Sequence, residues 1–364
     1  MIPYGKQTIR DEDIQAVVDV LKENNYLTPG HRVDLFEQKL CSYTGAKYCV
    51  AVSNGTAALH CAIKAINLKP ENEVIVPAIS FVASANCVLY MGATVVFCDI
   101  DKDTLNIDVN KLESLISLKT VAIISVDMAG NPVNFNEINH ICKKYGLYHI
   151  SDSAHSIGAS YNNIKIGNLA DLTTFSFHPV KNITTGEGGA ILTNNNEFYN
   201  IIRRFRSHGI DQDYRNRHFH YYDMIDLGYN YRITDIQCAL GISQLNMLDT
   251  YISKRRNIAH IYDMQLKPQY KKYRQINGAY HIYIVRLPDD LDRDTVYKYM
   301  LSHGVGCNVH YKPIYLHSFY KNLGYTEGLC PIAEETYKQI LTLPMYPTLT
   351  DDDQNKVINC LNSL

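Results

Sequence analysis

The chain has 364 residues, of which 46% are hydrophobic and 20% charged, a balance typical of globular proteins and not of disordered ones. Its 35 basic and 37 acidic residues leave a net charge of −2 without a basic tail, which argues against nucleic acid as a partner. No apolar stretch reaches signal-peptide or membrane-spanning length, so we expect a cytoplasmic protein that does not use a membrane.

Short apolar strands alternate with amphipathic helices along the first half of the chain. The first helix is expected over residues 11–23, where apolar residues recur at helical spacing. The elements expected next, in chain order, are strand 48–52, helix 55–66, strand 73–76, helix 84–90, strand 94–99, strand 120–126, helix 135–145, strand 147–151, strand 173–177 and strand 189–193. This alternation predicts a mainly parallel sheet covered by helices on both faces.

The pattern changes in the second part of the chain. Helical stretches are expected from Thr234 to about residue 266, and a closing helix after Thr350. Between them we predict strand 281–286, helix 293–303 and strand 307–311. A chain of this length exceeds the usual single core, so we predict a large domain over residues 1–248 and a small α+β domain over residues 249–364.

Ten cysteines are scattered along the chain, and none forms a CxxC pair with another. A scattered set of this kind, in a chain of this size, is typical of free thiols in a core. We therefore predict neither a disulfide framework nor a metal site.

Polar residues follow several of the predicted strands. In open α/β sheets ligands bind beyond the carboxyl ends of the strands, so these residues are candidates for a site. The first group is the turn Ser53–Leu59, whose glycine, hydroxyls and free helix amides could hold a phosphate. Taken alone, the same turn is also typical of an ordinary helix cap.

The second candidate is Asp152, at the end of a buried strand. A carboxylate there could hold the cationic nitrogen of a heterocycle, which a pyridoxal enzyme needs for its ring to act as an electron sink. An isolated aspartate at a strand end is more often a cap or turn residue.

The third candidate is Lys181, which lies just after the predicted strand 173–177 in a segment rich in hydroxyls and glycines. A desolvated lysine can form a Schiff base, although a lone lysine is usually a surface charge. The glycines at 186–189 do not match GxGxxG, so a dinucleotide site is not supported. Together the phosphate turn, the aspartate and, 29 residues later, the lysine match one cofactor, pyridoxal phosphate.

With these residues in place, the chain resembles the DegT-like sugar aminotransferases from residue 3 almost to the C-terminus. The resemblance implies the fold-type-I α/β architecture, with a mainly parallel sheet sandwiched by helices in the large domain and a smaller C-terminal α+β domain. The matching motifs, in family order, are Tyr26–Gly30, Ser53–Leu59, Ile79–Ala83, Asp152–His155, Ser176–Lys181, Arg206–Gly209 and Gly228–Arg232.

The resemblance also implies a role for each site residue. Lys181 would hold the cofactor and shuttle a proton, Asp152 would pair with the ring nitrogen, and His155 would lie beside the phenolic oxygen or the ring face. The remaining roles are Phe81 on the ring, Gly55, Thr56 and Ser176 at the phosphate with Asn230 from the neighbouring subunit, and Thr28, His310 and Tyr311 at the substrate.

Structural explanations stay open for some of these residues. Phe81 is also explained as plain core, His310 as a core histidine bonded to backbone, and Asn230 as a turn residue. His155 stands where many relatives have glutamine, and Ser151–Ser153 replaces the frequent Glu-Asp-Ala, which leaves the fine detail of the substrate open.

Within the family the resemblance is strongest to the transaminases that form UDP-4-amino-4,6-dideoxy-N-acetyl-β-L-altrosamine for pseudaminic acid synthesis. It is carried by residues 125–130, 175–181, 184–189 and 309–315. It implies that L-glutamate leaves its amino group on the cofactor as pyridoxamine phosphate, which passes it to C4 of a UDP-linked N-acetyl-4-keto-6-deoxy-L-hexose, in a homodimer with shared active sites.

Two other functions stay open. The first is C3 or C4 amination of another UDP-, GDP- or dTDP-linked keto sugar, and the second is a regulator that binds pyridoxal phosphate without turnover. Some relatives carry histidine in place of the lysine and dehydrate the sugar at C3, so the presence of Lys181 favours transamination.

Overall fold

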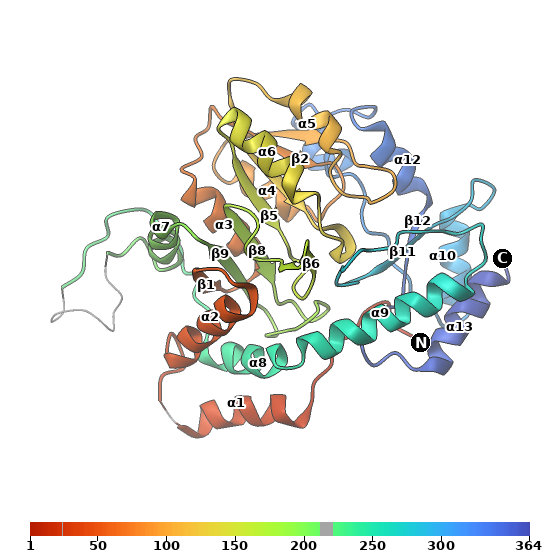
Figure 1. Ribbon diagram of the computed structural model, residues 1–364, viewed down its shortest axis with the longest axis horizontal. Coiled ribbons are helices and arrows are strands. Elements are labelled where there is room, and N and C mark those ends of the chain that lie inside the picture. Colours follow the sequence, from red (N-terminus) through yellow and green to blue (C-terminus); the bar gives the residue numbers. More distant parts are fainter. Residues whose placement is uncertain (24, 212–220) are drawn as a thin grey trace.

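A seven-stranded sheet forms the centre of the large lobe in the computed structural model, which describes residues 1–23, 25–211 and 221–364 (Figure 1). Strand β9 runs antiparallel to both of its neighbours, and the other pairs are parallel, so the expected mainly parallel sheet is confirmed. The strands, in spatial order, are β1 (Tyr48–Val52), β9 (Gly189–Thr193), β8 (Leu172–Ser176), β5 (Tyr148–Asp152), β4 (Thr120–Val126), β2 (Glu73–Pro77) and β3 (Thr94–Cys98).

Helices cover both faces of this sheet because its strands are apolar on both sides. In β2, for example, Val74 and Val76 belong to one core and Ile75 to the other, as the two-residue repeat of a strand requires. One face packs against α3 (Gly55–Ala65), α4 (Ala83–Leu89) and α7 (Asn196–Arg206), and the other against α2 (His31–Thr44), α5 (Val109–Leu115), α6 (Phe135–Tyr145) and α8 (Asp235–Leu245). Helix α1 (Asp11–Glu23) packs outside α8, and the shorter elements are η1 (Met128–Gly130), β6 (Ser160–Tyr161) and β7 (Ile164–Lys165).

The small lobe is built on a three-stranded antiparallel sheet of β10 (Lys271–Lys272), β11 (Tyr283–Arg286) and β12 (Ile340–Leu343). Helix α9 (Leu248–Gln265) runs from α8 into this lobe and encloses a third core there with α10 (Arg293–Ser302) and α13 (Asp351–Asn362) (Figure 1). The remaining elements are η3 (Ile314–Leu316), α11 (Ser318–Asn322) and α12 (Pro331–Gln339). The domain boundary at residue 248 stays a prediction, and that residue is the first of α9.

Where local signals are strong, the predicted elements match the structure. Helix α6 has its predicted bounds because Asn134 accepts a hydrogen bond from the Glu137 N–H at its start and Gly146 ends it in the left-handed conformation, with φ +68°. The ten cysteines have free thiols, as expected, and only Cys41 is partly exposed. Among the described helices, none has the length and apolar character needed to cross a membrane.

The predicted strand at 307–311 is wrong. Its residues alternate between apolar and polar, and Cys307 is buried in the small-lobe core, yet its backbone pairs with β12 only through a single bridge between Asn308 and Thr342. Beyond that bridge the chain leaves the sheet and carries its side chains toward the large lobe. Helices α2, α5, α7, α11 and α12 and strand β12 were not predicted, although in α7 the buried Phe198, Ile202 and Phe205 recur at helical spacing.

Candidate active site

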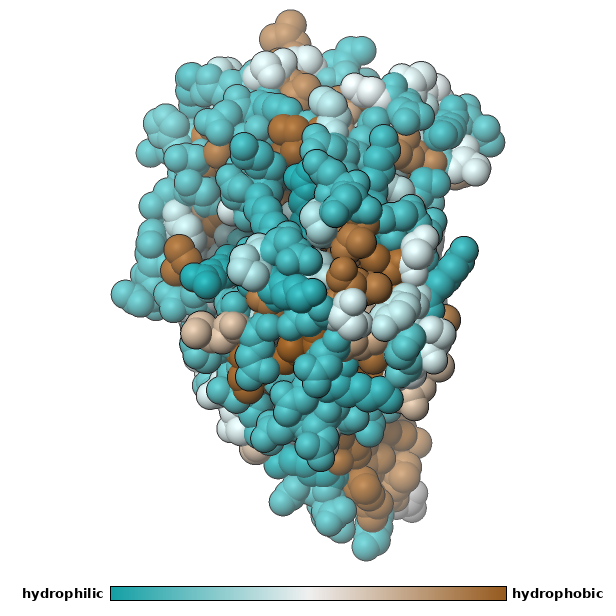
Figure 2. Space-filling view, turned by 90° about the vertical axis from the view of Figure 1, so that its right-hand side faces the viewer, coloured by the Kyte–Doolittle hydropathy of each residue, from teal (hydrophilic) through white to brown (hydrophobic). Residues whose placement is uncertain are grey.

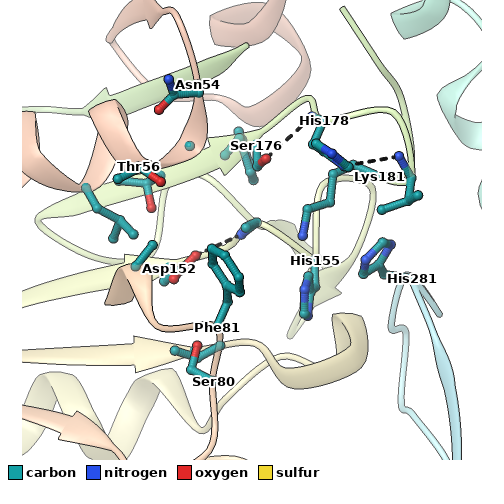
Figure 3. A pocket seen from close by; sticks show the side chains of 18 of the residues that line it. Asn54, Thr56, Ser80, Phe81, Asp152, His155, Ser176, His178, Lys181 and His281 are labelled. Carbon is teal, nitrogen blue, oxygen red and sulfur yellow. Dashed lines mark hydrogen bonds between the residues drawn. The ribbon is translucent and has the colours of Figure 1, made fainter. Parts of the chain in front are cut away.

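A cavity of about 730 Å³ lies at the carboxyl ends of the central strands, where loops of the large lobe meet residues of the small lobe (Figure 3). The end of β5 and the loop after β8 form one side, and the start of α3 and the loop before α4 form another. The predicted site residues that line this cavity are Gly55, Thr56, Phe81, Asp152, His155, Ser176, Lys181, His310 and Tyr311.

Two predicted residues lie outside this cavity. Thr28 and Asn230 are both exposed. The Thr28 hydroxyl lies 3.5 Å from the carbonyl oxygen of Ile233, and Asn230 forms an isolated bridge with Ser207. Their contacts with the substrate and with the cofactor of a neighbouring subunit therefore stay predictions.

Lys181 reaches the cavity from a tight turn that follows β8. Its backbone N–H donates to the carbonyl of His178 (2.9 Å), and its amine points into the cavity (Figure 3). Burial lowers the pKa of Lys181 to about 8, and the negative charge of Asp152 opposes that fall. An amine with this pKa is neutral in roughly a fifth of the molecules near pH 7.4, far more than an exposed lysine, and only the neutral form is a nucleophile.

Asp152 ends β5 and is only 6% exposed. Its carboxylate accepts hydrogen bonds from the Ser84 hydroxyl (2.6 Å) and the Ala154 N–H (3.2 Å), and the Ser84 hydroxyl lies 2.7 Å from that of Ser80. Burial raises the pKa of Asp152, while these bonds and the charge of Lys181 lower it. A cation placed beside this carboxylate would offset the cost of its burial. No sequence signal marks Ser84, which lies 68 positions away on α4.

A pair of buried histidines forms the wall of the cavity near Lys181. The rings of His155 and His281 have their centroids 4.4 Å apart, and the Tyr311 hydroxyl lies 3.3 Å from Nε2 of His155. Burial and the nearby Lys181 charge hold the pKa of both histidines well below the usual value, so both rings are neutral. The Nδ1 atoms of both rings have no partner among the described residues. His281 was not predicted, because a single histidine before an apolar strand carries no distinctive signal.

His310 lines the cavity although it is only 7% exposed. Its Nδ1 lies 2.8 Å from the Thr342 hydroxyl, and burial, helped by the charge of Lys181, lowers its pKa to about 3. It is therefore a neutral ring that both packs in the protein and borders the site.

The N-terminus of α3 forms an anion seat at the end of the cavity opposite the histidines. Asn54 caps the helix by accepting the N–H of Ala57 (2.8 Å), which leaves the N–H groups of Gly55 and Thr56 without an intrahelical acceptor. A methyl group on Gly55 would lie 2.8 Å from Cβ of Ser176, so a residue larger than glycine would not fit against β8. Free amides and a helix N-terminus together favour a phosphate.

Phe81 supplies an apolar surface between these groups. It is 56% exposed although it lines the cavity, and its ring lies 6.2 Å from that of Tyr311, so it is not plain core. An amine, a buried carboxylate, an anion seat and an open aromatic face fit a planar, phosphorylated, cationic heterocycle such as pyridoxal phosphate. Within the described parts of the chain, no group of three or more His, Cys, Asp or Glu residues is placed to hold a metal ion.

Known proteins are similar to this chain in sequence and in fold. Residues 7–362 match the DegT/DnrJ/EryC1/StrS aminotransferase family. A Campylobacter jejuni UDP-4-amino-4,6-dideoxy-N-acetyl-beta-L-altrosamine transaminase is 39% identical over 376 residues, which cover 100% of this chain and 97% of the relative. Helicobacter pylori PseC, an aminotransferase involved in the biosynthesis of pseudoaminic acid, has a TM-score of 0.94 at 34% identity and is covered over the whole of both chains.

Streptococcus pneumoniae Spr1654 is 30% identical and has been solved in a PMP form (TM-score 0.95) and a PLP form (TM-score 0.94), each match covering 100% of this chain and 98% of that one. These matches extend over nearly the full length of both chains. Like the residues that line the cavity, they indicate aminotransferase chemistry. This chain is therefore a member of the DegT/DnrJ/EryC1/StrS aminotransferase family and a sugar aminotransferase.

Proposed function

We propose that this enzyme binds pyridoxal phosphate at Lys181 and transfers an amino group from L-glutamate to C4 of a UDP-linked N-acetyl-4-keto-6-deoxy-L-hexose. The product is UDP-4-amino-4,6-dideoxy-N-acetyl-β-L-altrosamine, an intermediate of the pseudaminic acid pathway. The observation that carries the proposal is that the Lys181 amine and the Asp152 carboxylate line one cavity with the N-terminus of α3. The choice of sugar is supported by the likeness to the Campylobacter transaminase and to PseC.

The residues that line the cavity have separate roles in the proposed reaction. Pyridoxal phosphate, when bound, supplies the electron sink that acidifies the C–H bond next to the transferred nitrogen. Lys181 can bind the cofactor's carbonyl and can hold or release a proton at Nζ, because its pKa of about 8 lies near physiological pH. Asp152 would hold the positive ring nitrogen, and the N–H groups of Gly55 and Thr56 would hold the phosphate.

A groove beside the cavity could hold the nucleotide part of the substrate. It has a volume of about 490 Å³, and Tyr90 lines both the groove and the cavity. Its other walls include Phe319 and Tyr320, which offer apolar and aromatic surface to a base. Burial, and after it the charge of Lys312, lowers the pKa of His317 in the groove. Lys312 follows the cavity residue Tyr311, so a cation flanks the path a diphosphate would take.

We include a homodimer in the proposal because the segment 221–229 exposes many apolar side chains. This segment lies near α7, on the side of the molecule away from the small lobe (Figure 1), whereas the small-lobe face is mostly hydrophilic with separate apolar patches (Figure 2). Exposed apolar residues in one segment are typical of a protein interface. The exposed members, between 43% and 70%, are Tyr221, Tyr222, Met224, Ile225, Leu227 and Tyr229.

The function is tested by the visible absorption of the purified protein. Bound pyridoxal phosphate should give a band that L-glutamate removes and that the UDP-linked 4-keto-6-deoxy-N-acetyl sugar restores. Lys181→Ala should show no such band, whereas the matched control Lys165→Ala, on the surface strand β7, should keep it. Recovery only with a differently linked keto sugar would contradict the substrate, and the absence of a band in cofactor-supplied wild type would contradict the cofactor.

The shared site is tested by mixing two inactive variants. If Asn230 acts in the neighbouring subunit, a hybrid of Lys181→Ala and Asn230→Ala chains has one intact site, because that site takes its lysine from one chain and its asparagine from the other. Activity should therefore return after the variants are unfolded and refolded together. A mixture that stays inactive while it forms dimers would contradict the sharing.

A further inference from the structure

Asp127 is a buried carboxylate close to the cavity that the proposed chemistry does not use. It directly follows β4, and its backbone N–H donates to the carbonyl of Asp152 on the neighbouring strand β5 (3.3 Å). The side chain is fully buried, and no cation among the described residues pairs with it. Burying a carboxylate without a counter-ion costs free energy, so the hydrogen bonds that compensate for this cost are the key to its role.

The Asp127 carboxylate joins two loops. One oxygen accepts the backbone N–H of Val133 (2.9 Å), which closes the loop 127–133 that contains η1. The other oxygen accepts the hydroxyls of Ser153 (2.9 Å) and Ser156 (2.6 Å) in the turn that follows β5. Three donors from two segments therefore converge on this one side chain.

Each of these two loops contains or hydrogen-bonds one of the paired histidines. The turn 153–156 contains His155, and in the loop 127–133 the carbonyl of Ala129 accepts the N–H of His281 (2.9 Å). The two backbones also touch, because a methyl group on Gly130 would lie 2.8 Å from the carbonyl oxygen of His155. We propose that Asp127 is a positioning residue whose carboxylate ties the two loops together and so sets the placement of the His155 and His281 rings beside Lys181.

Burial disfavours the charged form of Asp127, so the charge itself does not stabilise the fold. Burial raises the pKa of Asp127 to about 6, its three hydrogen bonds lower the pKa, and the nearby Asp152 raises it. Asparagine has nearly the same shape but offers only one acceptor oxygen, so with that oxygen on the Val133 N–H it faces Ser153 and Ser156 with an amide that can only donate. Asp127→Asn therefore removes a buried charge and reverses the direction of the hydrogen bonds to the serines, whereas Ser153→Ala with Ser156→Ala removes those bonds altogether.

The test compares wild type, Asp127→Asn and the control Asp99→Asn. Asp99 is also buried, and it accepts N–H groups of Ile332 and Ala333 at the start of α12, outside the cavity lining. Crystal structures of the cofactor-free proteins give the separation of the two histidine rings, and thermal unfolding at pH 8 gives stability. The pH titration of the visible band and the split between kcat and KM are then measured with cofactor.

We expect Asp127→Asn to keep its melting temperature at pH 8 while the ring separation departs from 4.4 Å, the band titrates at a different pH, and kcat falls by about 10- to 100-fold with little change in KM. Asp99→Asn should lose stability and leave the rings and the titration unchanged. Ser153→Ala with Ser156→Ala cuts the link itself and is measured in the same way. Wild-type rings and titration in that folded double variant would overturn the proposal.

The inference rests on the proposed function only for the cofactor measurements. The ring separation is read from protein without cofactor, so a failure of the cofactor assignment and a failure of the Asp127 link give different results.

Discussion

Replacing Asp152 by asparagine should lower the pKa of Lys181 still further. Burial brings that pKa from 10.5 to about 8, and the charge of Asp152 is the interaction that opposes the fall. A fall of this size corresponds to roughly 3 kcal/mol against the ammonium form, and at pH 8 it raises the neutral fraction from about 0.3% to about half. Without the carboxylate, more of the amine is neutral at every pH below 8.

The assay is the rate at which the visible band develops after saturating pyridoxal phosphate is added to cofactor-free protein. In wild type the rate should rise with pH and level off near pH 8, and in Asp152→Asn it should level off at lower pH. Lys181→Met supplies the background from other lysines. A profile that levels off near pH 10 in wild type, or at the same or a higher pH in Asp152→Asn, would refute the reasoning.

The same shift predicts how stability depends on pH. Because the pKa of Lys181 is lower in the folded protein than in the unfolded chain, the folded state loses stability as the pH falls from 10.5 to about 8, and it is free of this cost above 10.5. Cofactor-free wild type should therefore gain up to roughly 3 kcal/mol relative to Lys181→Met between pH 8 and 10.5, measured by urea unfolding. Parallel curves for the two proteins would show that the amine is not desolvated.

Three further substitutions test the site and the core. Ser84→Ala removes the hydroxyl that donates to Asp152 (2.6 Å), so pyridoxal phosphate should bind about tenfold more weakly in an absorbance titration, and unchanged affinity would mean that this bond is unimportant. Gly55→Ala places a methyl group 2.8 Å from Cβ of Ser176 and should weaken cofactor binding, which Ser176→Gly should partly restore; wild-type affinity in the single variant would argue against a phosphate there. Phe177→Ala should cost about 3–5 kcal/mol of unfolding free energy in urea, because the ring is fully buried, and a loss below about 1 kcal/mol would contradict that packing.

Local patterns were enough to predict much of the fold. Strands 48–52, 120–126 and 189–193 have their predicted bounds because short apolar runs between polar turns are a local property of the chain. The segment 307–311 alternates apolar and polar residues as a strand can, but it is not a strand, because the hydrogen bonds of a strand depend on a partner that its own sequence does not contain. A local pattern of apolar residues predicts burial, but only the tertiary structure decides whether the buried segment also pairs with a neighbouring strand.

The candidate site divides in the same way. Lys181, Asp152 and the turn at Gly55 could be identified from the sequence by itself, because each follows a strand and their order matches one cofactor. The contact between Ser84 and Asp152, the pairing of His155 with His281 and the link through Asp127 could not, because each joins segments that meet only when the sheet and its loops are assembled. The depressed pKa of Lys181 also arises from burial by these distant segments, so the sequence determined which groups are present and the tertiary structure decided their charge and their neighbours.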